Sequence, residues 1–169
     1  MKSNIGFAFG VIIGLVVVSS SVGGEEFKQE VVRLKKTDLQ GQPIEIEVRR
    51  TKFPPDNIHK YGFWGGSEVP GDRLPDFLVS NISVKVGKEE IYIPLSAYGD
   101  LTEAREVSVD LETKKTFQLK ISGGDTAGSY TAVLTFANGA LTKRKVWSGE
   151  FPDERFEETK YSWIPDNGR

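Results

Sequence analysis

The side chains best suited to bind a ligand lie in one irregular stretch of the sequence, residues 53–76. They are the large amphipathic and cationic residues His59, Tyr61, Phe63, Trp64 and Arg73. A segment of this length without periodic hydrophobicity is uncommon inside a compact domain, and is usually either functional or mobile. Aromatic rings beside cations suit a sugar or a peptide, and loops on a rigid scaffold often carry binding sites. We therefore predict a ligand-binding site here. The alternative is that Phe63 and Trp64 fold back and plug one end of the domain.

Groups that could catalyse a reaction are few. His59 is the one histidine, so any Ser-His-Asp scheme would have to use it, and the sequence has no Gly-x-Ser-x-Gly elbow. Glycoside hydrolysis needs only two carboxylates. Five aspartates lie in predicted loops: Asp72, Asp76, Asp100, Asp125 and Asp153. Because loop aspartates more often cap turns, we predict no catalytic residue and keep a carboxylate-based hydrolase as the alternative function.

The composition also predicts no metal site and no cofactor. The chain has no cysteine and one histidine, so a structural zinc ion would lack its usual ligands. There is no EF-hand pattern either. The run from Gly123 to Thr126 could hold calcium, but a glycine turn with an aspartate cap explains it better.

The first 24 residues have the pattern of a secretory signal peptide. Lys2 precedes an apolar run from Ile5 to Val18, and small residues follow, so that cleavage is expected near Gly23. The run is short for a membrane span of about 20 residues. We predict an exported chain, periplasmic or extracellular, with an uncleaved N-terminal anchor as the alternative and the one route to a membrane. Since no cysteine follows the apolar run, lipid attachment through a lipobox thiol is excluded.

Charge narrows the class of partner. After cleavage the chain would keep 21 Lys and Arg residues against 24 Asp and Glu residues, a formal net charge of −3. A nucleic-acid binder needs a basic face to neutralise phosphates, so this balance argues against one. A protein or a glycan at the cell envelope is the partner that we expect.

Hydrophobic residues alternate with polar ones in short runs after residue 25, which is the pattern of half-buried strands. Ile44, Ile46 and Val48 give the clearest example. Eight or nine such runs, separated by turn residues at the spacing of a sandwich, predict one all-β domain over residues 25–169. We expect an antiparallel β-sandwich, immunoglobulin-like or C2-like, with a small closed barrel as the second choice.

Two hairpins can be given a register from their apolar residues. A Gly87-Lys88 turn of type II′ pairs Val84 with Ile91, Ile82 with Ile93 and Lys85 with Glu90. In the next hairpin, a three-residue loop at Glu112–Lys114 pairs Val109 with Phe117. A two-residue loop would set Leu111 against Thr116, so we prefer three residues.

The third hairpin turns at Asn138-Gly139, which favours a type I′ turn because both positions need positive φ. Its predicted core-face pairs are Phe136–Leu141, Leu134–Lys143, Ala132–Lys145 and Tyr130–Trp147. Two lysines then lie on the core face. Either their aliphatic stems cover the edge of the core, or they meet the carboxylates of Glu157 and Glu158.

From the sequence, then, we expect an exported, non-enzymatic β-sandwich that binds a macromolecule or a glycan through the 53–76 loop. The alternatives are the hydrolase and a structural envelope subunit that self-associates through an edge strand such as residues 91–95.

Overall fold

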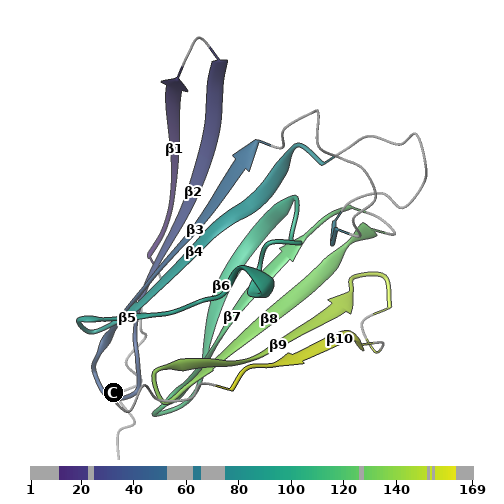
Figure 1. Ribbon diagram of the computed structural model, residues 1–169. Coiled ribbons are helices and arrows are strands. Elements are labelled where there is room, and N and C mark those ends of the chain that lie inside the picture. Colours follow the sequence, from purple (N-terminus) through teal and green to yellow (C-terminus); the bar gives the residue numbers. More distant parts are fainter. Residues whose placement is uncertain are drawn as a thin grey trace, which may run out of the picture.

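The computed structural model describes residues 12–22, 25–52, 63–65, 75–125, 128–151, 153 and 155–162. It is an all-β protein with two antiparallel sheets that face each other as layers (Figure 1). The first sheet has the order β1 (Ile12–Val22), β2 (Glu25–Thr37), β3 (Pro43–Lys52), β4 (Phe77–Val86) and β5 (Glu89–Ile91). The second has the order β10 (Arg155–Lys160), β9 (Ala140–Ser148), β8 (Tyr130–Ala137), β7 (Thr116–Gly123) and β6 (Ala104–Thr113).

The predicted antiparallel β-sandwich is confirmed, and the described strands form no closed barrel. Each sheet is a meander in which strands that follow one another in the sequence are neighbours. This order is simpler than the Greek-key connections of immunoglobulin domains. One connection joins the two layers. It leaves β5, forms the short 3-10 helix η1 (Leu95–Ala97), and enters β6, with Tyr98 and Leu101 buried on the way.

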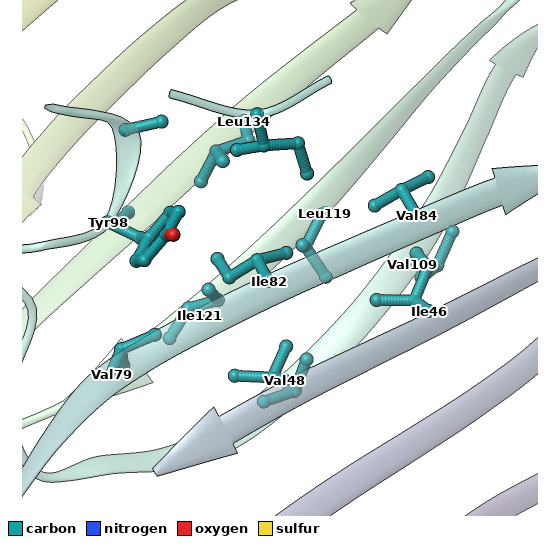
Figure 2. Packing of buried hydrophobic residues seen from close by; sticks show 14 of the residues in the cluster. Ile46, Val48, Val79, Ile82, Val84, Tyr98, Val109, Leu119, Ile121 and Leu134 are labelled. Atoms are coloured by element: carbon teal, nitrogen blue, oxygen red, sulfur yellow. The ribbon is translucent and has the colours of Figure 1, made fainter. Parts of the chain in front are cut away.

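The core lies between the two sheets. The alternation expected of residues 44–48 is observed, because Ile44, Ile46 and Val48 are buried whereas Glu45 is exposed. Figure 2 shows side chains of the first sheet facing those of the second across the interlayer space. The labelled residues are Ile46, Val48, Val79, Ile82 and Val84 on one side, Val109, Leu119, Ile121 and Leu134 on the other, and Tyr98 from the connection.

One side of the sandwich is closed by two cationic side chains. Lys36 on β2 donates to the carbonyl of Val109 at 2.7 Å, and Arg50 on β3 donates to the carbonyl of Ala104. Both carbonyls belong to β6, the edge strand of the other sheet. The two side chains therefore satisfy carbonyl groups of an edge strand and hold the layers together.

The β4–β5 hairpin follows the predicted register for as long as β5 lasts. Val84 lies opposite Ile91 and Lys85 opposite Glu90. Gly87 has a φ of 62°, as a type II′ turn requires at its first central position. The predicted pair of Ile82 with Ile93 does not form, because β5 ends at Ile91 and the chain turns towards the other sheet.

The β6–β7 prediction was wrong by two residues. The turn is Lys114–Lys115, an extra residue is accommodated as a bulge between Leu111 and Thr113, and Val109 pairs with Leu119. A shift of two residues keeps every side chain on its face of the sheet, so the buried residues were still identified correctly.

The β8–β9 hairpin has the predicted turn, with φ values of 52° at Asn138 and 79° at Gly139, and the predicted pair Phe136–Leu141. Beyond that pair the prediction was wrong by one residue, because the register shifts between Thr135 and Phe136 and leaves Thr142 as a bulge. A one-residue shift reverses the faces of a strand. The residues of β9 that enter the core region are therefore Arg144, Val146 and Ser148, rather than Lys143, Lys145 and Trp147.

Candidate functional site

The two ends of the sandwich are built differently, and each contains a candidate site. At one end lies the connection between β3 and β4, which contains the predicted ligand-binding loop. The structure describes Phe63, Trp64 and Gly65 of that loop. His59, Tyr61 and Arg73, which we also predicted to bind a ligand, lie outside the described residues.

Trp64 is attached by hydrogen bonds to the segment that directly precedes β6. Its N–H donates to the carbonyl of Asp100 at 2.9 Å, and its carbonyl accepts from the N–H and the hydroxyl of Thr102, both at 2.8 Å. Its ring packs against the core and is half-buried, and its indole N–H donates to Glu157 at 3.4 Å. For Trp64, the structure thus shows the folded-back arrangement that the sequence left open.

Arg144, in the middle of β9, is the centre of a polar cluster that reaches Trp64, and with it the loop end of the sandwich, through Glu157. Its side chain is only 3% exposed, and its guanidinium donates to the carbonyl of Ser96 at 2.9 Å and to Oδ2 of Asp100 at 2.7 Å. The same guanidinium lies 3.5 Å from Oε2 of Glu157. The cluster connects three separate parts of the chain, namely β9, β10 and the connection between the sheets.

The bulge at Thr142 explains why a charged residue is buried there. Thr142 donates its hydroxyl to the carbonyl of Thr135 at 3.1 Å, and after the bulge Arg144 faces the core region. The neighbouring lysines face outwards instead. Lys145 lies 3.7 Å from Glu158, so one of the predicted lysine–carboxylate contacts does form, although on the outer face.

Two tyrosines border the Arg144 cluster. Burial raises the pKa of Tyr130 far above its usual value of 10.0, and the nearby carboxylate of Asp100 raises it further. The Tyr130 hydroxyl donates to the carbonyl of Thr102 at 2.9 Å. Burial also raises the pKa of Tyr161. The phenol of Tyr130, kept neutral in this way, is a hydrogen-bond donor and not a base.

The described aspartates do not form the arrangement that a carboxylate hydrolase needs. Asp76, Asp125 and Asp153 are exposed, and Asp100 is held by the cation of Arg144. Asp72 lies outside the described residues. Nor do the described residues contain a group of three or more His, Asp or Glu side chains that could hold a metal ion. The Arg144 cluster therefore makes internal contacts that connect β9, β10 and the segment between the sheets, because one guanidinium serves both carboxylates.

The opposite end of the sandwich has an open cleft of about 330 Å³. Four hairpin turns surround it: β2–β3, β4–β5, β6–β7 and β8–β9. Its apolar floor consists of Val86, Ile91, Leu111 and Phe117. Its rim is polar and consists of Asp38, Gln40, Gln42, Glu89, Thr113, Lys114, Lys115, Thr116 and Asn138.

Local hydrogen bonds shape the rim of this cleft. Oδ1 of Asp38 accepts from the backbone N–H groups of Gln40 and Gln42, both at 2.8 Å, and so fixes the β2–β3 turn. The side-chain amide of Gln40 donates to the carbonyl of Lys114, which ties the tips of the two sheets together. The cleft is thus framed by both layers.

Sequence reasoning missed this cleft. Its polar residues are ordinary turn residues, and each turn is explained by its own hairpin. The available signal was that hairpin turns at one end of a meander lie next to one another. Which of them face each other across the two sheets depends on how the sheets stack.

Among the described residues, no helix is long and apolar enough to cross a membrane. Comparisons of the chain with protein-family models, with curated proteins and with solved structures gave no significant match.

Proposed function

We propose that this chain is an exported, non-enzymatic binding module that holds a hydroxyl-rich glycan of the cell envelope in the cleft at its hairpin tips. One observation carries the proposal, namely that this cleft combines an apolar floor with a polar rim. Its volume is near the lower end of the range for ligand sites, which is about 300–1,000 Å³. This size favours one or two sugar rings at a time over a large folded partner.

The chemistry of the rim favours a glycan. Amide side chains from Gln42 and Asn138, together with the hydroxyls of Thr113 and Thr116, offer donors and acceptors in the pattern that sugar hydroxyls need. The apolar floor suits the C–H face of a ring. Two lysines are balanced by Asp38 and Glu89, so the rim favours a neutral sugar over a polyanion.

The loop predicted from the sequence has a different part in this proposal. The folded-back Trp64 supports a structural role for the described part of that loop. His59, Tyr61 and Arg73 remain a sequence prediction. If the cleft is the binding site, a Tyr61→Ala, Arg73→Ala double variant binds the glycan as the unmodified chain does.

Affinity gel electrophoresis in gels containing dextran, a β-glucan or alginate tests the proposal. We expect one of the neutral polysaccharides to retard the unmodified chain. Gln42→Ala should weaken that retardation about fivefold, because one lost hydrogen bond costs on the order of 1 kcal/mol. Leu111→Trp should abolish it by filling the cleft. Gln118→Ala is the matched control, since this amide lies on β7 outside the cleft and donates to Glu112.

Two results would contradict the proposal. The first is that neither neutral polysaccharide retards the chain. The second is that Leu111→Trp, with its fold verified by circular dichroism, is retarded as strongly as the unmodified chain.

A further inference from the structure

The outer edge of β2 is occupied by a part of the chain that we predict to be removed. β1 pairs with β2 along its whole length, from Ile12 opposite Lys35 to Val22 opposite Glu25 (Figure 1). All of β1 lies within the predicted signal peptide, residues 1–24. Cleavage near Gly23 would remove β1 and leave β2, a strand of 13 residues, with an open edge.

An open edge of this length is a liability, because its unpaired N–H and C=O groups are a template for another strand. Two other edge strands of the sandwich are protected against pairing with a further strand. β5 has only three residues, and Lys36 and Arg50 donate to carbonyls of β6. The structure itself shows what the β2 edge accepts, namely a long antiparallel strand.

We propose that, after export, the β2 edge pairs antiparallel with β2 of a second copy of this chain. The pairing has Val31, the middle residue of β2, on the two-fold axis. All 13 residues then overlap. Gln29 lies opposite Arg33, and residue 26, a glutamate, lies opposite Lys36.

Charge selects this register and favours a second copy as the partner. Like charges directly opposite each other destabilise a strand pair, whereas opposite charges stabilise it. Moving the axis by one residue in one direction sets Glu30 opposite itself. Moving it the other way sets residue 28, a lysine, opposite Lys36. With Val31 on the axis no like charges meet, because β2 begins with acidic residues and ends with basic ones.

The sandwich leaves room for this pairing. The two-fold axis is perpendicular to the sheet, so the core faces of both copies stay covered by their own second sheets. The outer faces stay in water with their ion pairs, such as Arg33 with Glu47 at 3.0 Å and Lys35 with Glu45 at 2.7 Å. The result is one continuous sheet across two copies, as in other isologous dimers.

The absence of cysteine from the chain makes the register directly testable. The full gene, including its own signal, is expressed in an exporting bacterium, and the N-terminus of the exported chain is determined by mass spectrometry. Single-cysteine variants are then oxidised. Val31→Cys should form a covalent dimer, because residues opposite each other have Cβ atoms close enough for a disulfide. Arg33→Cys and the off-edge control Lys85→Cys should stay monomeric on denaturing gels.

A second measurement does not depend on changing the buried Val31. A mixture of Gln29→Cys and Arg33→Cys chains should give a crosslinked heterodimer, whereas neither variant crosslinks alone. Analytical ultracentrifugation of the unmodified exported chain should give twice the monomer mass. The proposal is overturned if the exported chain retains β1, if it sediments as a monomer, or if Lys85→Cys crosslinks as readily as Val31→Cys. None of these readouts involves a glycan.

Discussion

The two ends of this sandwich differ in how their polar groups are used. At the loop end, polar groups are turned inwards and contact one another, since Arg144 bridges Asp100 and Glu157, and Tyr130 donates to the carbonyl of Thr102. At the hairpin-tip end, polar side chains line the rim of an open cleft. One end therefore uses its polar groups in internal contacts, whereas the other presents polar groups around an open cleft.

This difference shows that residues whose types suggest a binding site can be occupied by contacts within the protein, whereas ordinary turn residues can line an open cleft. The aromatic and charged residues at the loop end suggest a binding site in the sequence. The backbone of Trp64, however, is hydrogen-bonded to the backbone of Asp100 and Thr102. The cleft is built from glutamines, threonines and lysines of common turns. Because the loop-end residues make internal contacts, we expect substitutions there to reduce stability much more than substitutions at the rim of the cleft.

The largest effect is expected for Arg144→Met. Removing one partner of a fully buried ion pair costs about 3–5 kcal/mol, and here we expect the lower end of that range because the side chains of Asp100 and Glu157 are 32% and 29% exposed. Arg144 is buried, and it serves both Asp100 and Glu157. Urea unfolding followed by tryptophan fluorescence measures the loss. The triple variant Arg144→Met, Asp100→Asn, Glu157→Gln is the control, and should recover part of it because no unpaired charge remains. A loss below about 1 kcal/mol for Arg144→Met would mean that the loop end is not held by this cluster.

Two glycines with similar backbones compare the ends directly. Gly65 at the loop end has a φ of 89° and Gly41 at the tip end a φ of 84°. A Cβ on Gly65 would lie 2.7 Å from the carbonyl oxygen of Thr102 and 2.9 Å from the ring of Tyr130, whereas a Cβ on Gly41 would meet nothing within 4 Å.

Gly41→Ala should therefore cost only the left-handed backbone penalty, about 1–2 kcal/mol. Gly65→Ala should cost about 1–3 kcal/mol more, because overpacking is added. The measurement is the difference in the free energy of unfolding between the two variants. Equal losses would show that the contact of Gly65 with Thr102 and Tyr130 is loose.

The strand pattern was predictable because alternation and turn chemistry are local. Ile44, Ile46 and Val48 could be placed in the core from their spacing alone, and Asn138-Gly139 identified its turn. The bulge at Thr142 could not be predicted in this way. A bulge is set by how one strand fits its neighbour over several residues, and no residue type marks it.

The bulge at Thr142 determines which residue of β9 lies at the centre of the polar cluster. Without it, Lys143 and Lys145 appear on the core face and Arg144 on the outer face; with it, Arg144 becomes the buried centre of the polar cluster. The error in β6–β7 had no such consequence, because a shift of two residues preserves the faces. The candidate cleft escaped prediction for a third reason, since it depends on how two sheets stack.

An intermediate effect is expected from alkaline pH. Burial raises the pKa of Tyr130 in the folded state above the ordinary value of 10.0. The folded state therefore holds this proton more tightly than the unfolded state, and its contribution to stability is complete below pH 10 and is lost as the pH rises further. Tyr130→Phe should lower stability at pH 8, because the hydrogen bond to Thr102 is lost, but should reduce the fall in stability between pH 9 and pH 11.

Part of the alkaline fall should persist in that variant, because burial also raises the pKa values of Tyr98 and Tyr161. Tyrosinate absorbance near 295 nm, recorded with the unfolding curve at each pH, separates titration from unfolding. An unchanged pH dependence in Tyr130→Phe would show that the hydroxyl of Tyr130 is accessible to water, and that the loop end is as open as the other.

The smallest effect is expected at the rim of the cleft. Gln40 is exposed, and its side chain makes one hydrogen bond, to the carbonyl of Lys114. Water can replace such an exposed bond, so Gln40→Ala should change the free energy of unfolding by no more than about 0.5 kcal/mol. Hydrogen exchange should show faster opening of the β6–β7 tip, with the exchange rates of β8 unchanged. A loss as large as that of Gly65→Ala would mean that the hairpin tips of the two sheets are packed as tightly as the loop end. The cleft would then be a structural contact between the two sheets and not an open site for a ligand.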